Sequence, residues 1–525
     1  MVTHFLSRRP LWTVVGLPLL ALGLFLGLVD GLARAEEPEI LYVAPGGECG
    51  GAAPCFASIQ AAVDAASNGA QIRVAAGTYT GVTTALVSGI SYTQVVLITR
   101  SLSLQGGYTR THWLHPNPSA HPTIVDARQQ GRAITIVGSG SQSVTVAGLI
   151  LTGGDYTGLG NPPGVGNRSC VRTGSDCGGG LFARRVTLTL RDVTLVDNTA
   201  SRTSNYSDGG GAYLWEVNPG SRIERSRFVQ NRALTEDGAG GGLALVFTGA
   251  ITLTDTRFEQ NRAAAHGGGL YLFQPQETVS ILDSAFISNE VNASGGGGLS
   301  ARLTQDGLAL HLERTIFRQN QAWGQAAAIN LVKQGIGNTR VTMDNVLLAA
   351  NRLSAPGSTG AVVNGEGGSG GALGLQLRHV TWADHANLAA LRLSNAYEYP
   401  VTAQVENGLI VTATSAYLAR RTGTGTVTIR HTNTLRHNVT DLHTVEAGAP
   451  TFQATNPLHG DPRLDADFHL QAGSAAIDAG VDVDIHDDID RDRRPMGAGP
   501  DVGADEFVFT RIYLPHVSSA APDGE

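Results

Sequence analysis

Polar residues that recur at a fixed interval are the first candidates for chemistry in this chain of 525 residues. One such set lies six residues before a series of regularly spaced asparagines, and it consists of Asp192, Arg225, Asp255, Asp283, Arg314 and Asn345. If successive members lie on neighbouring strands about 5 Å apart, Asp255 and Asp283 have the separation of a retaining glycosidase pair. Because aspartate alternates with arginine, we expect a ladder of ion pairs at a corner of the fold, with catalysis and calcium binding as alternatives.

A second acidic group lies near the C-terminus, where carboxylate oxygens offer the ligands that calcium prefers. It consists of Asp482, Asp484, Asp487, Asp488, Asp490 and Asp492. The spacing does not fit an EF-hand, which needs glycine at the sixth loop position and glutamate at the twelfth. Arg491, Arg493 and Arg494 can neutralise these acids. We therefore expect a solvated, ion-paired turn with structural calcium as the alternative, and no other metal or cofactor.

Three histidines, His431, His437 and His443, recur every six residues. In a single extended strand six residues span about 20 Å, which is too far for one metal ion. The sequence therefore predicts no metal site here unless the chain folds back on itself. It also contains no G-x-S-x-G elbow, HExxH motif or P-loop.

The elements that position these residues form a repeat of about thirty residues over 178–351. Each repeat has a glycine run, a short apolar alternation and a strand that ends in Phe-x-x-Asn or Leu-x-x-Asn. The asparagines are Asn198, Asn231, Asn261, Asn289, Asn320 and Asn351, at spacings of 33, 30, 28, 31 and 31. Apolar residues alternate with a period of two, as in strands, and no segment here has the period of a crossover helix. This pattern predicts a solenoid of stacked β-coils with aromatic and asparagine ladders.

Stacked coils also place one row of side chains outward after the glycine runs. The alternation that turns Ala212 inward turns Tyr213 outward. Over successive coils this outward row contains Phe182, Tyr213, Trp215, Tyr271 and Phe273. Because aromatic faces stack on sugar rings or on a protein partner, we predict these five side chains as the ligand-binding residues. The alternative is that a long loop, residues 153–177 or 199–208, packs over them.

The glycine-rich repeats resemble those of polymorphic outer-membrane proteins, within the pectin-lyase-like class. Near the start of the chain, residues 41–45 (LYVAP) and 56–63 (FASIQAAV) are similar to the N-terminal end of such proteins. Near its end, residues 473–480 (GSAAIDAG) and 501–506 (DVGADE) are similar to bacterial choice-of-anchor Q surface proteins. The resemblance implies an all-β, single-stranded right-handed parallel β-helix over most of residues 40–507. It implies little about activity, because this fold carries lyases, hydrolases and adhesins.

The segments on either side of the repeats are expected to close the solenoid. Ser58 is a favourable helix N-cap, and the apolar residues after it share one helical face: Ile59, Ala62, Val63 and Ala66. A short capping helix here would cover an open sheet edge. We expect the β-helix to span residues 36–455, a closing segment to span 456–507, and a polar tail to span 508–525.

The first 35 residues have the charged, apolar and small-residue parts of a secretory signal peptide. We expect cleavage after Ala35. Because the apolar stretch 11–29 is long enough to span a bilayer, an uncleaved anchor is the alternative, and the membrane is otherwise not an expected partner.

The cysteines and the net charge fit an exported protein. An even number of cysteines in such a chain favours disulfides, and we expect the local pairs Cys49–Cys55 and Cys170–Cys177. The formal net charge of −8 argues against a nucleic-acid partner.

These features predict a secreted or cell-surface β-helix scaffold that binds a polysaccharide or a surface protein without catalysis. The alternative is a polysaccharide lyase or glycoside hydrolase on the same fold. A cluster of outward carboxylates with a basic partner in one groove would favour the enzyme.

Overall fold

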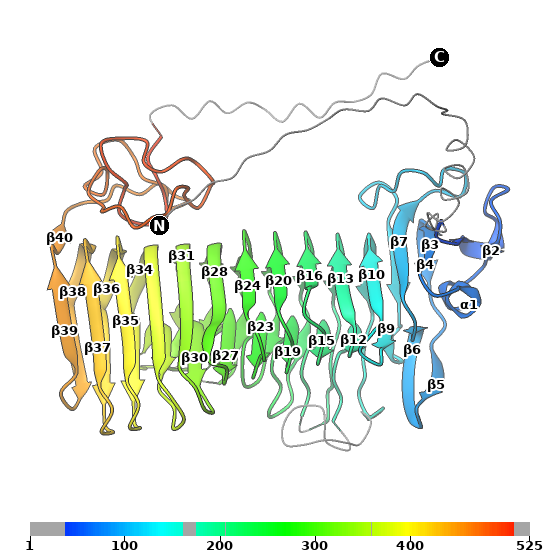
Figure 1. Cartoon of the computed structure of the whole chain (residues 1–525), viewed down its shortest axis with the longest axis horizontal. Coiled ribbons are helices and arrows are strands. Elements are labelled where there is room, and N and C mark those ends of the chain that lie inside the picture. Colours follow the sequence, from blue (N-terminus) through cyan, green and yellow to red (C-terminus); the bar gives the residue numbers. More distant parts are fainter. Residues whose placement is uncertain (1–36, 161–174, 205, 294, 359, 509–525) are drawn as a thin grey trace, which may run out of the picture. The chain divides into compact units, whose positions relative to one another are not determined.

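The short strands of the repeat stack in parallel, and each pairs with its counterpart one coil further along the chain (Figure 1). The computed structural model describes residues 37–160, 175–204, 206–293, 295–358 and 360–508. From Glu39 onward these residues form one unit that is built almost entirely of β-strands. The coils make a right-handed parallel β-helix, so the predicted fold class is confirmed.

The coils have three faces. The first face contains β6 (Ile90–Ile98), β9 (Arg132–Val137), β12 (Leu181–Arg184), β15 (Ala212–Trp215), β19 (Leu243–Val246), β23 (Leu270–Phe273), β27 (Leu299–Leu303), β30 (Ala326–Lys333) and β33 (Ala361–Glu366). The second face contains β1 (Ile40–Val43), β3 (Ala70–Ala75), β7 (Leu102–Tyr108), β10 (Ser143–Ala147), β13 (Thr187–Arg191), β16 (Ser221–Glu224), β20 (Ile251–Thr254), β24 (Val279–Leu282), β35 (Val401–Glu406), β37 (Val427–Thr432) and β39 (Thr451–Thr455). The third face contains β4 (Gly77–Tyr79), β8 (Thr123–Asp126), β11 (Leu149–Thr152), β14 (Thr194–Val196), β17 (Arg227–Val229), β21 (Arg257–Glu259), β25 (Ala285–Ile287) and β40 (Leu458–His459).

Longer strands and a small additional sheet complete the coils. Strands that bend across more than one face are β28 (Gly307–Arg318), β31 (Thr339–Ala349), β34 (Leu373–Asn395), β36 (Leu409–Arg421) and β38 (Leu435–Ala447). The small sheet beside the third face contains β18 (Arg232–Ala233), β22 (Arg262–Ala263), β26 (Glu290–Val291), β29 (Gln321–Ala322) and β32 (Arg352–Leu353). Two further strands, β2 and β5, cover Cys55–Phe56 and Thr83–Val87.

The interior is held together by the two ladders that the repeat predicts. The rings of four consecutive phenylalanines stack with centroids 4.6 to 4.8 Å apart, and all are fully buried: Phe228, Phe258, Phe286 and Phe317. The side-chain Nδ2 of Asn231 donates to the side-chain Oδ1 of Asn261 on the next coil at 3.0 Å, and this bond recurs from coil to coil. Each buried asparagine is thus satisfied by its neighbours, as burial of polar groups requires.

Glycine is needed where the first face begins. Gly240 has φ of +63°, a conformation that favours glycine, and it recurs at the start of each glycine run. At Gly241 a Cβ atom would collide with the Arg262 carbonyl oxygen of the small sheet. These runs therefore have a structural role, because they allow two parts of one coil to approach closely.

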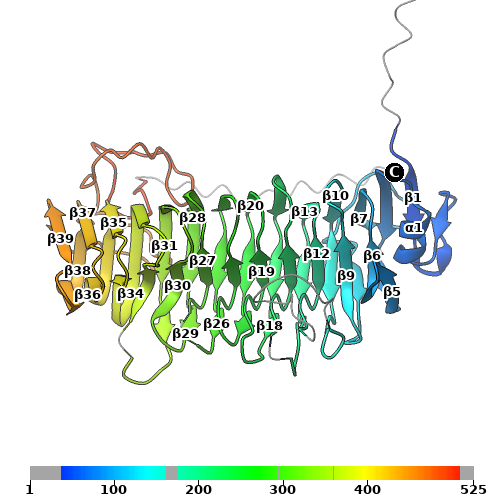
Figure 2. The same cartoon turned by 60° about the horizontal axis from the view of Figure 1, so that its bottom comes forward.

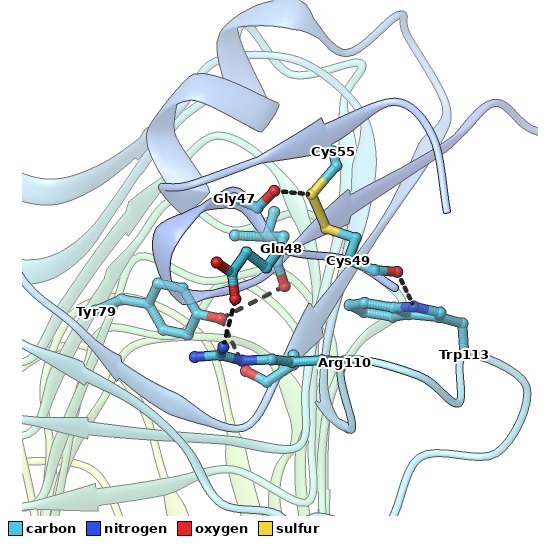
Figure 3. The surroundings of a disulfide bond; sticks show 9 residues. Gly47, Glu48, Cys49, Cys55, Tyr79, Arg110 and Trp113 are labelled. Atoms are coloured by element: carbon cyan, nitrogen blue, oxygen red, sulfur yellow. Dashed lines mark hydrogen bonds and ion pairs between the residues drawn. A yellow bond between two sulfur atoms is a disulfide. The ribbon is translucent and has the colours of Figure 1, made fainter. Parts of the chain in front are cut away.

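The N-terminal end carries the predicted cap. The helix α1 (Ile59–Ala65) begins after Ser58, whose hydroxyl accepts the Ala61 amide at 3.2 Å, and it buries Ile59 against the first coils. The predicted disulfide Cys49–Cys55 is present beside it (Figure 3). The Trp113 indole donates to the Cys49 carbonyl at 3.1 Å and packs on this loop.

The C-terminal segment is placed differently from the expectation that residues 456–507 close the end of the solenoid. In Figure 1 it lies over the upper edge of the last coils, while the strand β39 is left largely exposed. Asn345, Asn407 and Asn433 lie at one position on the outer turns of the coils, with His379 at that position between the first two. The three asparagines donate to carbonyl oxygens of this segment at 2.7 to 2.9 Å. These hydrogen bonds hold the segment against the side of the coils.

Several expectations fall on residues outside those that the structure describes. They are the signal peptide at residues 1–35, almost all of the tail at 508–525, and Cys170 of the second predicted disulfide. None of the helices in the described ranges has the length and hydrophobicity to cross a membrane.

Candidate functional site

The row of five predicted ligand-binding aromatic residues lies on the outer side of the first face, but it is not accessible. Its members belong to a cluster separate from the interior core, as the strand alternation predicts. They are at most 4% exposed: Phe182, Tyr213, Trp215, Tyr271 and Phe273. The prediction that this row contacts a ligand is therefore wrong for the folded protein.

Side chains from other parts of the chain cover this aromatic row. Tyr92 of the β5–β6 hairpin packs on Phe182 with ring centroids 6.0 Å apart. The buried Arg132 guanidinium lies between Phe182 and Tyr156, 3.3 Å from the Tyr156 ring centroid. His266 stacks on Tyr271 at 5.5 Å. The alternative of a covering loop thus holds for the described part of 153–177, because outward apolar rings are shielded from water by this second layer.

The alternating Asp and Arg residues form the expected ion-pair ladder, and we call this row, with its continuation through His379, Asn407 and Asn433, the turn column. Arg225 makes two bonds to Asp192, at 2.8 and 3.1 Å. Asp283 is bound by Arg314 at 2.6 Å and by Arg491 of the C-terminal segment at 3.0 Å. Burial favours a higher pKa for Asp283, but the bonds from these two arginines outweigh it and lower the pKa. Asp255 lies one coil before Asp283 and is exposed, and because two arginines keep Asp283 ionised, Asp283 is not a proton donor for glycoside cleavage.

The second face carries a carboxylate cluster that the sequence analysis missed. Asp344 is bound by Arg378 through two bonds of 2.7 Å, and Glu313 lies 3.2 Å from the His311 ring. The hydrogen bond from His311 and the charge of Arg314 lower the pKa of Glu313. The cluster could have been found from the sequence, because Glu313, Asp344 and Arg378 occupy the same position on consecutive coils. Since each acid is neutralised by a basic partner, the cluster has the features of a structural ion-pair network.

Asp208, Asp488 and Asp501 have raised pKa values, and burial is the main cause for each. It raises the pKa of Asp208 to about 7 and the pKa values of Asp488 and Asp501 to about 6. All three accept backbone amides: Asp208 from Ala239 at 3.1 Å, Asp488 from Glu506 at 2.9 Å, Asp501 from Phe507 at 2.6 Å. Because each carboxylate is buried and bound to backbone amides, the three acids have the features of structural residues rather than of general acids.

The C-terminal acidic run does not converge on one point. Asp482 accepts the amide of Asp484, and Asp488 accepts the amides of Asp490 and Asp492, all at 2.8 to 2.9 Å. Asp487 binds Arg314 on the turn column instead. The carboxylates are thus distributed among turns, and they do not form one calcium site.

The chain folds back and brings two of the three histidines together, which is the exception that the sequence left open. The Nε2 atoms of His431 and His443 lie 2.8 Å apart, because β37 and β38 lie on different faces of one coil and both rings pack on the buried Tyr417. Burial, followed by the charges of His443 and Arg436, lowers the pKa of His431 to about 4. His437 lies elsewhere on β38, and no third ligand joins this pair in the described ranges.

A polar groove runs along the asparagine ladder, and we call it the ladder groove. It has a volume of about 830 Å³ and lies between the third face and the small sheet, whose strands β18, β26 and β29 are labelled in Figure 2. Its walls are two rows of residues, one before and one after each ladder asparagine. The lining residues on six coils are Gln230, Arg232, Gln260, Arg262, Ser288, Glu290, Gln319, Gln321, Ala350, Asn351, Arg352, Asp384, His385 and Ala386.

The backbone produces this groove. The residue before each ladder asparagine has a left-handed conformation, with φ between 51° and 60° at Gln230, Gln260, Ser288, Gln319, Ala350 and Asp384. This conformation bends the chain sharply between the third face and the small sheet. Since the asparagine points inward, the side chains before and after it both point outward and form the two walls.

The groove walls offer hydrogen-bonding groups at the spacing of the coils. Gln230 donates to Gln260 at 3.0 Å, and Arg262 binds Glu290 at 2.7 Å. The Arg262 side chain is 58% exposed, so its remaining donors face solvent. Three arginines and two acids line the groove, which makes it slightly cationic in a chain of net charge −8.

The far end of the groove shows where the ladder changes residue type. His385 occupies the next asparagine position, with its two ring nitrogens 3.2 and 3.0 Å from the carbonyl oxygens of Asn351 and Leu348. Burial lowers its pKa to about 4, although both carbonyls and Asp384 favour the charged ring. Trp382 likewise continues the phenylalanine column by pairing with Leu348. The repeat that is visible in the sequence ends at Asn351, because the next coil has histidine at the asparagine position and tryptophan at the phenylalanine position.

No protein-family model matches the chain, and no curated protein matches it in sequence. Among solved structures, the pectate lyase Pel9A is similar over 90% of this chain and 96% of its own, with 15% identity and a TM-score of 0.40. The catalytic domain of a GH87 alpha-1,3-glucanase, in complex with tetrasaccharides, is similar over 76% and 66%, with 12% identity and a TM-score of 0.43. PfbA, a surface adhesin of Streptococcus pneumoniae, is similar over 79% and 91%, with 9% identity and a TM-score of 0.36. These likenesses concern the fold alone, and the resemblance to polymorphic outer-membrane repeats and choice-of-anchor Q proteins stays a prediction.

Proposed function

We propose that the protein is an exported β-helix that binds an extended glycan along the ladder groove without cleaving it. The observation that carries this proposal is the repetition of polar side chains on both walls of one groove over six coils. With coils about 4.8 Å apart, the groove extends about 24 Å. A repetitive linear polymer is the ligand that fits a site of this periodicity.

The chemistry of the walls supports a polyhydroxylated ligand. Glutamine side chains offer both donors and acceptors, and arginines offer several donors, which together match hydroxyl groups that donate and accept. Gln260 and Arg262 lie on the second of the six coils that line the groove. Their bonds to neighbouring coils hold the side chains in place before a ligand arrives, and this lowers the entropy cost of binding.

The acids of the groove do not make a hydrolytic pair. Glu290 and Asp384 lie three coils apart, about 14 Å, whereas the two acids of a glycosidase are separated by about 5 to 9.5 Å. Glu290 is also bound by Arg262 at 2.7 Å. Binding without turnover is the function that these distances favour.

Export is supported by the Cys49–Cys55 disulfide, since such bonds persist in oxidising compartments. It agrees with the signal peptide expected at residues 1–35. We therefore place the groove outside the cytoplasm, where it meets polysaccharides.

The test is affinity electrophoresis of the full chain in gels that contain neutral or uronic-acid polysaccharides. Gln260→Ala combined with Arg262→Ala should weaken retention about tenfold or more, because hydrogen bonds to a charged group are lost. Arg430→Ala is the matched control, since Arg430 is exposed on the second face and binds Gln453 at 2.8 Å as the groove arginines bind their neighbours. Equal retention of both variants would contradict the proposal, as would release of oligosaccharides by the wild type.

A further inference from the structure

A cluster of three potential metal ligands lies in the C-terminal segment, away from the ladder groove. It consists of His469, Asp490 and Asp505, and we call it the C-terminal triad. Each residue offers one ligand atom, and these atoms lie within 4.8 Å of one another. Ligands that bind a tetrahedral zinc ion at about 2.0 to 2.1 Å are about 3.3 Å apart, so the triad needs only small side-chain movements to enclose an ion.

The three residues come from separate loops that are already ordered. The Asp465 carboxylate accepts the His469 amide at 2.9 Å, and the Asp488 carboxylate accepts the Asp490 amide at 2.9 Å. Asp505 is 4% exposed, and its Oδ2 atom accepts the Leu470 amide at 2.6 Å. The ligand positions are therefore fixed by the backbone.

The histidine ring has the orientation that metal sites use. Its Nε2 atom lies 2.8 Å from the Asp490 carboxylate, on the side of the triad. Its Nδ1 atom lies 3.7 Å from the Asp465 carboxylate on the other side. At this distance Asp465 is an ion-pair partner of the ring, and a small shift of the ring would make it the hydrogen-bonded outer carboxylate that often orients a ligating histidine.

A cavity of about 210 Å³ adjoins the triad and is lined by all three of its residues. It has room for water molecules, which can complete the coordination of an ion held by three protein ligands. Arg318 also lines the cavity, but Asp467 binds it at 3.2 Å, so the local charge is still negative. The cavity is bounded by Leu347 and Thr381 of the β-helix, which places the triad where the C-terminal segment meets the coils.

We propose that the C-terminal triad binds one divalent transition-metal ion, with Zn²⁺ as the preferred ion. One imidazole and two carboxylates suit zinc, whereas calcium takes oxygen ligands alone. Of the acidic run that the sequence analysis considered for calcium, only Asp490 takes part. The bound ion joins three loops of the C-terminal segment and stabilises it against the coils.

The test uses untagged full-length protein, stripped with a chelator and titrated with Zn²⁺ by isothermal calorimetry. We expect one Zn²⁺ per chain, no measurable binding in His469→Ala, and binding weakened about 10- to 100-fold in Asp465→Asn. His486→Ala is the control, because the His486 side chain is exposed and lies 3.1 Å from Asp484, outside the triad. Zn²⁺ should also raise the melting temperature of the wild type but not that of His469→Ala.

Three results would overturn the proposal. One is a wild type that binds no Zn²⁺, and another is a wild type that binds Ca²⁺ in preference to it. The third is binding that persists in His469→Ala and disappears in His431→Ala, which would place the ion at the His431–His443 pair. If His469→Ala does not fold by circular dichroism, Asp490→Asn replaces it, since the Asp490 side chain is 42% exposed.

Discussion

Single residues in the ladders show why the repeat can be detected and where it stops. A buried asparagine is retained from coil to coil because each amide bonds the next, so its spacing is visible in the sequence. His385 fills the same position with its ring nitrogens 3.2 and 3.0 Å from two carbonyl oxygens, one of which a neutral ring can bond, and no asparagine pattern reveals this. A residue that meets the same bonding requirement with another side chain is invisible to a search by residue type.

His385 leads to a prediction about pH. The unfolded chain takes up a proton on this residue near pH 6.5, whereas the folded protein keeps it neutral down to about pH 4. Between these values the unfolded state binds more protons, so the stability contributed by the neutral ring is complete above pH 6.5 and is lost as the pH falls. The loss amounts to about 3 kcal/mol at pH 4.

His385→Asn should remove this dependence, because asparagine continues the ladder and does not titrate. The measurement is urea unfolding of both proteins between pH 6.5 and pH 4, and the difference between their unfolding free energies is compared at each pH. Other titrating groups contribute equally to both proteins. A difference that stays constant over this range would show that His385 is protonated in the folded state.

At the scale of elements, the aromatic row shows that the direction in which a side chain points and its exposure to solvent have different causes. Alternation along β15 and β23 gives the direction of Tyr213 and Tyr271 correctly, because the period of a strand is local. Accessibility depends on Tyr92, Tyr156 and other residues that reach the row from distant segments. The sequence pattern of one element contains no information about such a covering layer.

The covering layer gives a prediction about stability. Trp215→Ala combined with Tyr271→Ala should lower the unfolding free energy by several kcal/mol, since emptying a buried aromatic site costs about 3 to 5 kcal/mol. Trp323→Ala is the matched control, because Trp323 is 53% exposed and should cost less than about 0.5 kcal/mol. Thermal unfolding followed by circular dichroism measures both. A double variant that melts with the wild type would mean that the row is open to solvent.

The turn column also combines a feature that the local sequence pattern predicts with a contact made by a distant segment, here the C-terminal segment. Its alternating charges predict an ion-pair ladder, and Arg225 and Asp192 form one within the coils. The partner of Arg314 on the other side, Asp487, lies 173 residues away in the sequence. That the ladder also binds a returning segment follows from the tertiary structure alone.

At the scale of the whole molecule, the fold was predictable because a β-helix is specified by one short period repeated many times. Leu181 lies against Ala212, and the same register continues through Leu243 and Leu270. The ladder groove was not predictable in the same way. It arises from a left-handed backbone bend at glutamine, serine, alanine and aspartate, residue types that share no pattern.

If the ladder groove binds an extended glycan, the affinity depends on the length of the glycan, and a single measurement can test this. Oligosaccharides of increasing length, prepared from the polysaccharide that retains the protein most strongly, are titrated by calorimetry against the full chain. We expect the affinity to rise with length until the oligosaccharide spans about 24 Å, the extent of six coils, and then to level off while the ligand stays intact. An affinity independent of length, or shortened products recovered from the titration, would contradict a groove that binds an extended glycan without cleaving it.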